Sequence, residues 1–323
     1  MARHLVVGAG GIGRATAAAL VARGHTVDLA SRRGTDPGMP SVRAVTLDAT
    51  DPEALVRAAA GAASIVNATN PRSYAHWDRD WPPVADALLA AAERSGAGLV
   101  TVSNLYGYGQ VDAPMTEATA LRPNGTKGRV RASMWEQAYA AHLAGRARVT
   151  ELRAADYLGP GASAGMSYLG HYVVRPAALG TGIRLPMGDP DAPHSWTYLA
   201  DIGTLAATLA TDERSWGRVW HVPTNPARSM REVAADAAAL AGRESPRIGR
   251  LPAALMWFAR VSPTIRSLEE TRHQFEGPFV LDSDHTQATF GLTPTDWTDA
   301  LTATVAAYLP GQPLTGRTEP ARS

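Results

Sequence analysis

The sequence predicts an α/β fold, in which a doubly wound parallel sheet is followed by a smaller C-terminal lobe. Short apolar runs alternate with Ala-rich helical patterns through the first half of the chain. Strands that alternate with helices form crossover units, which enclose a parallel sheet between two layers of helices. A glycine-rich turn between the first strand and the first helix supports the same fold class.

The elements of the first half follow from these patterns in order. Apolar runs predict strands at residues 4–9, 26–32, 42–48, 64–70, 98–104 and 148–156. Ala-rich periodic stretches predict helices at residues 13–24, 51–61, 81–96 and 127–144. Gly24 is typical of a helix end, and Asp51 followed by Pro52 is typical of an N-cap and a first helical position.

The regular alternation breaks after about residue 160. Residues 217–224 predict one further strand, and residues 229–243 predict a helix that opens with a capping box of Ser229 and Glu232. An apolar cluster at residues 254–260 is expected in the core or at a subunit interface.

Composition bounds the class of protein. The chain has 323 residues, of which 45% are hydrophobic, enough for one large core or two coupled ones. Its 31 basic and 30 acidic residues nearly cancel, which argues against a nucleic-acid partner. The absence of cysteine and of His-x-x-x-His spacing argues against a metal site and fits a reducing compartment. Without a secretory signal or a run of ~18 apolar residues, we expect a soluble cytoplasmic protein with no membrane partner.

The glycine-rich turn points to a dinucleotide. Gly8, Gly10 and Gly13 have the G-x-G-x-x-G spacing, with Gly11 and Ile12 between them. In this spacing the glycines permit a tight turn, a close approach of backbone to a pyrophosphate, and close packing of helix on strand. The helix N-terminus then offers free N–H groups to phosphates. The pattern therefore predicts a Rossmann-type dinucleotide site, against the alternative of a loop that only turns.

The end of the second strand favours NADP(H) over NAD(H). A site selective for NAD carries an acidic residue there to bind the ribose 2′-hydroxyl. This strand ends instead in Ser31, Arg32 and Arg33, while Asp28 lies earlier within it. Guanidinium groups beside a hydroxyl suit a 2′-phosphate, although an ordinary basic loop is the alternative. Asp48, at the end of the third strand, either accepts from the adenine amino group or caps a turn.

These features divide the chain into three predicted parts. Residues 1–160 form the dinucleotide-binding Rossmann domain, and residues 161–309 form mainly a substrate-binding lobe. Within the lobe, segments such as 196–222 return to the Rossmann sheet. Residues 310–323 form a flexible tail rich in Pro, Gly and polar residues.

The whole pattern resembles the short-chain dehydrogenase/reductase superfamily, in its extended, epimerase/dehydratase-like branch. The resemblance includes the glycine turn and four later segments: "NAT" (67–69), "SNLYGYG" (103–109), "RAADYLGPG" (153–161) and "WTYLADIG" (196–203). It implies that cofactor-binding residues follow the fourth and sixth strands, namely Asn67, Ala68, Thr69 and Tyr157. For Tyr157, packing in the core is an equal alternative.

The chain departs from this family where a Tyr-x-x-x-Lys pair is expected. If Glu136 is the Glu that usually follows the Lys by four residues, the Tyr and Lys positions fall on Gly128 and Ala132. If Lys127, the only lysine of the chain, is the Lys instead, the Tyr position falls on Pro123. The glycine turn also lacks the spacing G-x-x-G-x-x-G that is usual in the extended branch.

Another phenol and another cation must then move the proton, or the reaction must not need them. One hypothesis makes Tyr106 the acid/base, with Lys127 lowering its pKa and Ser103 holding the substrate oxygen. The alternative places Lys127 at the surface and the tyrosines in packing. His171 and His194 are further candidates for a general acid, although a structural role is favoured for both.

Three functions stay open on these residues. The first is an NADP(H)-dependent oxidoreductase or epimerase-type enzyme that acts on a small carbonyl or hydroxyl metabolite. The second is an isomerase, dehydratase or lyase without net redox on the same scaffold, and the third is a non-catalytic dinucleotide-sensing protein. The helix at residues 127–143 resembles the one through which relatives dimerise, which is compatible with a homodimer.

Overall fold

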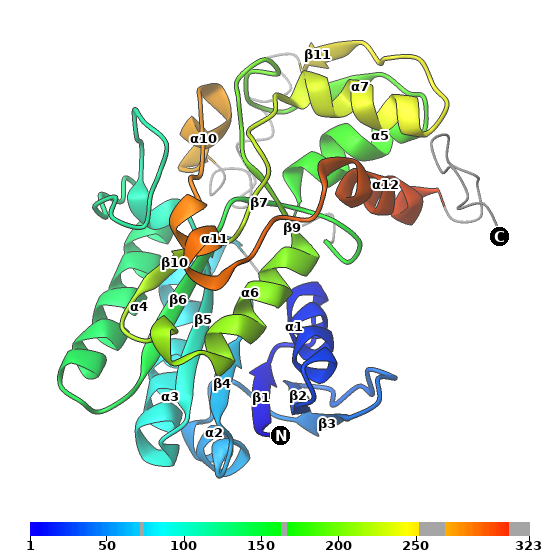
Figure 1. Ribbon diagram of the computed structural model, residues 1–323. Helices are drawn as coiled ribbons and strands as arrows, with labels where there is room; N and C mark the ends of the chain where they lie inside the picture. Colours follow the sequence, from blue (N-terminus) through cyan, green and yellow to red (C-terminus); the bar gives the residue numbers. More distant parts are fainter. Residues whose placement is uncertain (72–73, 163–166, 252–268, 310–323) are drawn as a thin grey trace.

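A parallel sheet of seven strands forms the centre of the larger part of the molecule, which is the lower part in Figure 1. The computed structural model describes residues 1–71, 74–162, 167–251 and 269–309, so the predicted cluster at 254–260 and the predicted tail lie outside them. The strand order is β10-β6-β5-β4-β1-β2-β3, and every neighbouring pair is parallel. The strands are β1 (Arg3–Val7), β2 (Thr26–Ser31), β3 (Val42–Thr46), β4 (Ser64–Asn67), β5 (Gly98–Asn104), β6 (Val149–Ala154) and β10 (Val219–His221). The predicted fold class is confirmed.

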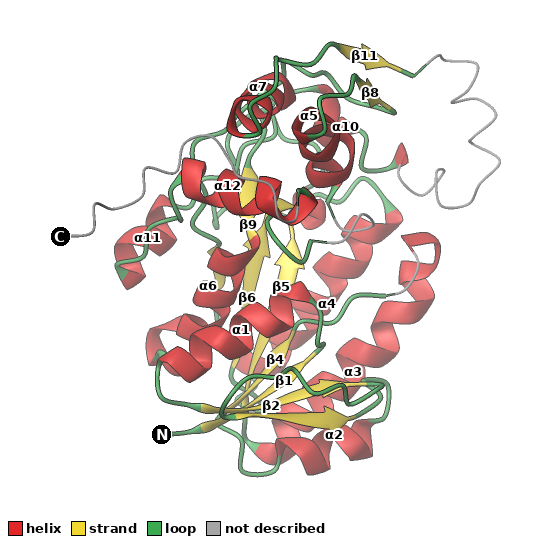
Figure 2. Ribbon diagram, turned by 90° about the vertical axis from the view of Figure 1, so that its right-hand side faces the viewer, coloured by secondary structure: helices red, strands yellow, loops and turns green. Residues whose placement is uncertain are grey.

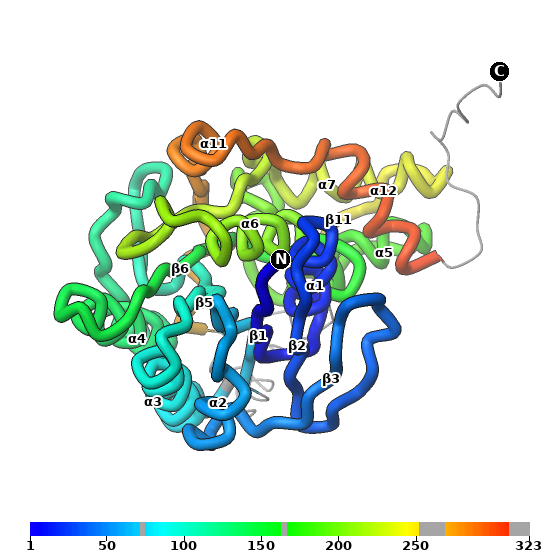
Figure 3. Tube along the Cα trace, turned by 60° about the horizontal axis from the view of Figure 1, so that its bottom comes forward, coloured from blue at the N-terminus to red at the C-terminus, as the bar shows by residue number. Residues whose placement is uncertain are grey.

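Helices cover both faces of the sheet (Figure 3). One face carries α1 (Gly11–Ala22) and α6 (Leu199–Thr211), and the other carries α2 (Pro52–Ala59), α3 (Trp77–Ser95) and α4 (Thr126–Leu143). Because both faces are buried, the central strands are continuous apolar runs: Leu5, Val6 and Val7 of β1 are all buried. In a strand with a polar residue at every second position, those polar side chains would be buried under a helix without hydrogen-bond partners.

Helix α3 begins four residues earlier than the sequence predicts. It starts at Trp77, so Pro82 and Pro83 lie inside it. Neither proline has an N–H, and the bonds that they would donate to carbonyls one turn earlier are missing. Trp77 and Trp81 are both buried and compensate by packing together, with ring centroids 6.0 Å apart. The early start brings the first turns of α3 to the edge of the sheet.

The smaller lobe lies over the carboxyl ends of the strands (Figure 2). Its strands pair in twos, β7 with β9 and β8 with β11. A second core at the centre of this lobe includes Val173, Trp196, Val233 and Leu301. The remaining elements are β7 (Asp156–Leu158), η3 (Gly170–Val174), α5 (Arg175–Ala178), β8 (Ile183–Leu185), β9 (Trp196–Tyr198), α7 (Met230–Leu240), β11 (Ile248–Arg250), α10 (His273–Glu276), α11 (Asp284–Phe290), α12 (Trp297–Tyr308) and the short turns η1 (Tyr74–His76), η2 (Tyr106–Tyr108) and η4 (Glu213–Ser215).

Both helix starts that the sequence predicts from capping residues are present. The side chain of Asp51 accepts from Ala54 N at 3.0 Å, with Pro52 opening α2. Ser229 and Glu232 form the reciprocal capping box of α7. None of the helices in the described part of the chain combines the length and the apolar composition that a bilayer crossing needs.

Candidate functional site

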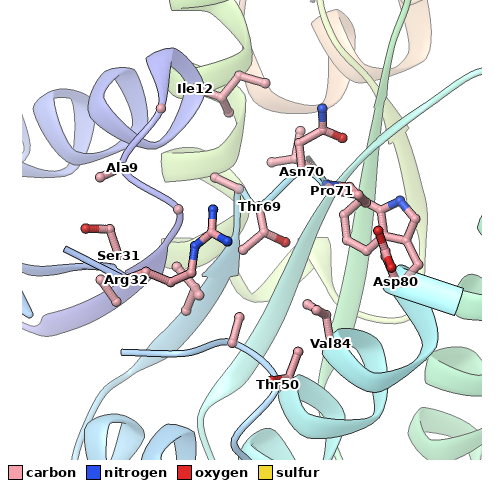
Figure 4. A pocket seen from close by; sticks show the side chains of 18 of the residues that line it. Ala9, Ile12, Ser31, Arg32, Thr50, Thr69, Asn70, Pro71, Asp80 and Val84 are labelled. Carbon is pink, nitrogen blue, oxygen red and sulfur yellow. The ribbon is translucent and has the colours of Figure 1, made fainter. Parts of the chain in front are cut away.

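A cavity of about 760 Å³ lies at the carboxyl end of the sheet (Figure 4). This volume is within the ~300–1,000 Å³ typical of small-molecule sites. The sheet order places β1 between β4 and β2, and an open α/β sheet binds ligands where the strand order reverses in this way. The lining comes from the glycine turn, from the ends of β2, β4 and β5, from the segment after β3, and from α3 and α4.

The glycine turn is shaped by close backbone contacts. Gly8 has φ +113°, and a Cβ on it would lie 2.4 Å from the carbonyl oxygen of Ala68. A Cβ on Gly13 would lie 1.7 Å from the carbonyl oxygen of Gly8. At Gly10, in contrast, a Cβ would meet no atom of the described residues within 4 Å. The turn is thus closed toward the protein at its two ends and open toward the cavity at its middle.

The predicted phosphate-binding residues are at this opening. Gly8, Gly10, Gly11 and Ile12 line the cavity, whereas Gly13 packs beneath it. Helix α1 begins at Gly11 without a side-chain cap, so its first N–H groups are left for a ligand. An uncapped helix N-terminus beside a cavity favours an anion such as a pyrophosphate.

At the end of β2 the cavity is basic. Ser31 and Arg32 line it, and Figure 4 shows Arg32 extending into it near Thr69. Arg33 is exposed and does not line the cavity.

Asp28 is buried within the sheet and forms ion pairs with two arginines. Its carboxylate accepts from Arg3 at 2.6 Å and from Arg43 at 2.7 and 2.8 Å. Burial opposes ionisation, but the bonds and charges of Arg43 and Arg3 outweigh it and hold the pKa of Asp28 below its ordinary value. Asp28 therefore stays an internal counter-charge for two arginines.

The segment after β3 closes the same side of the cavity. Asp48 and Thr50 both line it. The Oδ1 of Asp48 accepts from Thr50 N at 2.9 Å and from Thr50 Oγ1 at 2.8 Å, so this residue caps a turn. The capped turn holds the Asp48 carboxylate at the cavity wall.

The turn after β4 forms the cavity wall on the side of β1 opposite β2. Asn67 is buried and does not line the cavity, but its Oδ1 accepts from Thr69 N at 3.2 Å and from Thr69 Oγ1 at 2.6 Å. This bonding fixes the turn that exposes Ala68 and Thr69 to the cavity. Tyr157, from the lobe strand β7, lines the cavity as well.

The structure does not bring Ser103, Tyr106 and Lys127 together at the cavity. Ser103 is 1% exposed, and its neighbours Val102 and Asn104 line the cavity in its place. Successive side chains of a strand point to opposite faces, so Ser103 faces away from the cavity wall that Val102 and Asn104 form.

Tyr106 packs against an aromatic ring, and Lys127 forms an ion pair. The ring of Tyr106 stacks on Trp77, with centroids 5.8 Å apart. Lys127 is 2% exposed, and its Nζ donates to Glu270, whose other oxygen accepts from Thr126 N at 2.6 Å. Burial lowers the pKa of Lys127, and the bond to Glu270 opposes that shift. Lys127 is therefore neither at the surface nor among the residues that line the cavity.

Helix α4 has no room for a large side chain at Gly128, the Tyr position in the register that takes Glu136 as the family Glu. A Cβ on Gly128 would lie 2.5 Å from the carbonyl oxygen of Tyr106. Ala132, at the Lys position, is buried. The cation that this helix contributes to the cavity wall is Arg131, 6% exposed.

Arg131 is a site residue to which the sequence analysis gave no role. Its guanidinium carbon lies 4.1 Å from the ring centroid of Trp81 and 5.1 Å from that of Trp77. It follows Lys127 by four residues, and residues four apart share one helix face. That spacing is a signal in the sequence for a second buried cation.

The two candidate histidines lie outside the cavity lining. His194 is buried, with Nε2 2.8 Å from Asp156 Oδ2 and Nδ1 3.0 Å from the carbonyl oxygen of Gln274. Both ring nitrogens are thus engaged, which is a structural role. His171 packs edge-on against Tyr172 at 4.6 Å. Within the described ranges, no three His, Asp or Glu side chains gather as metal ligands would.

Residues 8–180 match the model of a family described as NAD(P)H-binding. No curated protein matches the chain. The glycine turn, the wall after β2 and the turn after β4 all lie within the matched residues.

Solved structures with the same fold cover nearly the whole chain. A Thermus thermophilus UDP-glucose 4-epimerase complex with NAD is 19% identical, with a TM-score of 0.74 over 96% of this chain and 100% of the other. A Bacillus anthracis dTDP-glucose 4,6-dehydratase in complex with NAD is 18% identical, with a TM-score of 0.77 over 97% and 98%. A Streptomyces venezuelae dTDP-glucose 4,6-dehydratase with NAD bound is 22% identical, with a TM-score of 0.75 over 96% and 97%. The resemblance to the epimerase/dehydratase-like branch is confirmed at the level of the fold.

Proposed function

Because the chain belongs to the NAD(P)H-binding family, we propose that it is an NADP(H)-dependent oxidoreductase or epimerase-type enzyme acting on a small carbonyl or hydroxyl metabolite. The observation that carries this proposal is the extent of the cavity. It reaches from Arg32 at the end of β2, past the glycine turn, to Asn104 and Arg131 beyond β5. Its length along the sheet edge suits a dinucleotide with space for a small substrate at the β5 end.

The residues around the cavity fit a nicotinamide dinucleotide. The open middle of the glycine turn and the uncapped start of α1 would hold the pyrophosphate. Ser31, Arg32 and Asp48 would hold the adenosine half, and Thr69 and Tyr157 would border the nicotinamide half. A bound nicotinamide dinucleotide supplies a hydride donor or acceptor. The protein itself would orient the cofactor and the substrate and would exclude water with the buried indoles of Trp77 and Trp81.

Charge at the end of β2 supports NADP(H). Arg32 extends into the cavity beside Ser31, and the nearest acidic residue of the strand, Asp28, is bound to Arg3 and Arg43. A 2′-phosphate would gain charge-assisted bonds from the Arg32 guanidinium. A 2′-hydroxyl would find no carboxylate of β2 to accept its proton, since Asp28 is buried.

Calorimetry with the full chain tests this proposal. We expect NADPH to bind roughly tenfold or more tightly than NADH, and Arg32→Ala to remove that difference, as loss of one charge-assisted contact predicts. Arg33→Ala is the matched control, because it removes an adjacent exposed arginine that does not line the cavity. Equal affinities for the two cofactors would refute the preference, and the failure of both to bind would refute the function.

The same site is compatible with chemistry that has no net redox. Solved structures of the same fold include epimerases and dehydratases. The near-ultraviolet absorbance of reduced nicotinamide distinguishes the two cases: an oxidoreductase changes it in step with product, whereas an epimerase forms product while it stays constant. A dinucleotide sensor would bind the cofactor and form no product.

A further inference from the structure

Asn124 is the only asparagine of the chain that precedes a glycine. Of the other asparagines, Asn67 precedes alanine, Asn104 precedes leucine, and Asn70 and Asn225 precede proline. In an Asn-Gly step the backbone nitrogen of the glycine can reach the amide carbon of the asparagine side chain, because the glycine has no side chain to obstruct the approach. This step therefore carries a chemistry that the rest of the chain does not.

The structure leaves both reacting groups of this step free. Asn124 lies in the segment before α4 and is exposed. Its amide nitrogen lies 3.3 Å from Nδ1 of His273, and this exposed contact is the only hydrogen bond of its side chain to the described residues. Gly125 is the N-cap of α4, and its backbone N–H donates to no acceptor in the described part of the chain. Neither the amide nor the attacking nitrogen is held by a helix or a sheet.

The other asparagines lack one of these conditions. Two of them precede proline, whose nitrogen carries no hydrogen and cannot attack. The nitrogen that follows Asn67 is engaged in the sheet, because Ala68 N donates to the carbonyl oxygen of Val7 at 2.8 Å. Asn104 is followed by Leu105, which is 1% exposed and places a branched side chain where the approach would occur.

The contact with Glu270 explains why a glycine stands at position 125. A Cβ on Gly125 would lie 2.4 Å from Oε2 of Glu270, and the same oxygen accepts from Thr126 N at 2.6 Å. The carboxylate that pairs with Lys127 would have to move to admit a side chain there. The packing at the start of α4 thus keeps beside Asn124 the neighbour that leaves its amide open to attack.

From these contacts we propose that Asn124 is a site of spontaneous deamidation in the folded protein. The nitrogen of Gly125 loses its proton to water and bonds to the side-chain amide carbon of Asn124. The carbon–nitrogen bond of the amide then breaks, ammonia leaves, and a succinimide ring closes. Water opens the ring at either carbonyl and yields aspartate or isoaspartate. The net reaction consumes water and releases ammonia, without oxidation or reduction, and it does not depend on the proposed function.

The two products affect α4 differently. An aspartate adds a carboxylate just before the first turn, which the positive end of the helix dipole favours. An isoaspartate routes the backbone through the former side chain, which lengthens it and displaces Thr126 from Glu270. Losing a hydrogen bond to a charged acceptor should lower the Tm of a chain of 323 residues by about 2–4 °C.

Peptide mapping by mass spectrometry on the full chain tests the proposal. The folded protein is kept in mildly alkaline buffer, and a parallel sample is unfolded in guanidinium chloride. In the folded protein we expect the mass increase that exchange of an amide for a carboxyl group produces, confined to the peptide that carries Asn124. Enzymatic methylation of the isoaspartyl carboxylate measures that product, and the Tm should fall as it accumulates.

Two variants separate the steps. Asn124→Gln is the matched control, because its amide carbon lies one methylene farther from the backbone, and it should keep both its mass and its Tm through the same incubation. Asn124→Asp reproduces one product and, before incubation, should melt within about 1 °C of the wild type. A fall in the Tm of the incubated wild type is then due to isoaspartate.

Each result decides a part of the proposal. If the unfolded chain is modified at Asn124 and the folded protein is not, the fold protects the site and the proposal is wrong. Absence of the modification from both samples overturns it as well. Equal modification at Asn67 or Asn104 in the folded protein would refute the argument that free groups select Asn124. If isoaspartate forms and the Tm is unchanged, the modification site is confirmed and its effect on α4 is wrong.

Discussion

Glu270→Gln should destabilise the protein strongly, because Glu270 serves two groups at once. Its carboxylate pairs with the Lys127 ammonium, which is 2% exposed, and accepts from the backbone N–H of Thr126 in the first turn of α4. Removing one partner of a buried pair leaves a buried charge and typically costs about 3–5 kcal/mol. The Glu270 side chain is itself 22% exposed, and water there offsets part of the loss. We therefore expect a loss of about 2–4 kcal/mol.

Thermal unfolding followed by circular dichroism measures this effect. In a chain of 323 residues each kcal/mol shifts the Tm by roughly 1.5 °C, so a decrease of about 3–6 °C is expected. Glu276→Gln is the matched control: its partner Arg272 lies in the same segment, but the pair is exposed, and such pairs contribute about 1 kcal/mol or less.

A double-mutant cycle with Lys127→Met isolates the pair from other effects. Because the Met variant removes the charge that Glu270 neutralises, the two substitutions together should cost less than the sum of their separate costs. A Glu270→Gln protein that melts within about 1–2 °C of the wild type, or fully additive substitutions, would refute the reasoning that Lys127 is a structural cation.

The glycine turn, a buried histidine and Ser103 each allow a further prediction. Gly13→Ala should lower the Tm by about 5 °C or more, because its Cβ would lie 1.7 Å from the carbonyl oxygen of Gly8. Gly10→Ala should keep the Tm, because its Cβ would meet no described atom within 4 Å, but it should weaken NADPH binding, measured by calorimetry. Burial, followed by the charge of His25, lowers the pKa of His4 to about 4 from 6.5, so the unfolded chain binds more protons between these values. The free energy of unfolding, measured by urea titration, should therefore fall by about 2 kcal/mol as the pH falls from 6.5 to 4. His4→Gln should flatten this pH dependence, whereas His76→Gln, at an exposed position, should leave it unchanged. Ser103→Ala should leave both the Tm and the NADPH affinity unchanged, because the buried Oγ has no hydrogen-bond partner among the described residues.

Local patterns were sufficient to predict the sheet and which residues lie in the cavity wall at the ends of β2 and β3. Buried parallel strands are short apolar runs, and the glycine turn requires its residues for steric reasons that are visible in the sequence. Ser31, Arg32 and Asp48 lie at or within two residues of strand ends, so the strand prediction alone brings them to one edge. Arg33 comes from the same reasoning but lies outside the lining, and Asn67, which the family resemblance implied, bonds to Thr69 instead of lining the cavity.

The cavity wall beyond β5 was harder to predict because its geometry depends on partners distant in sequence. The end of β5 carries polar residues on both faces, Ser103 on one and Asn104 on the other, so the sequence does not show that Val102 and Asn104, rather than Ser103, face the cavity. Lys127 has its carboxylate 143 residues away, and no local pattern indicates that pairing. The position of Trp77 depends on a helix that continues through Pro82 and Pro83, whereas sequence rules place such prolines in the first turn of a helix.

The contact between Glu270 and the start of α4 also bears on the order of events during synthesis. A nascent chain folds from its N-terminal end as it leaves the ribosome. Once residue 154 has emerged, six of the seven strands of the sheet exist and α4 can pack on them. The carboxylate that closes the first turn of this helix is then still more than a hundred residues from being made. The ion pair of Lys127 with Glu270, and the bond from Thr126 N to the same carboxylate, can therefore form only when nearly the whole polypeptide has been translated.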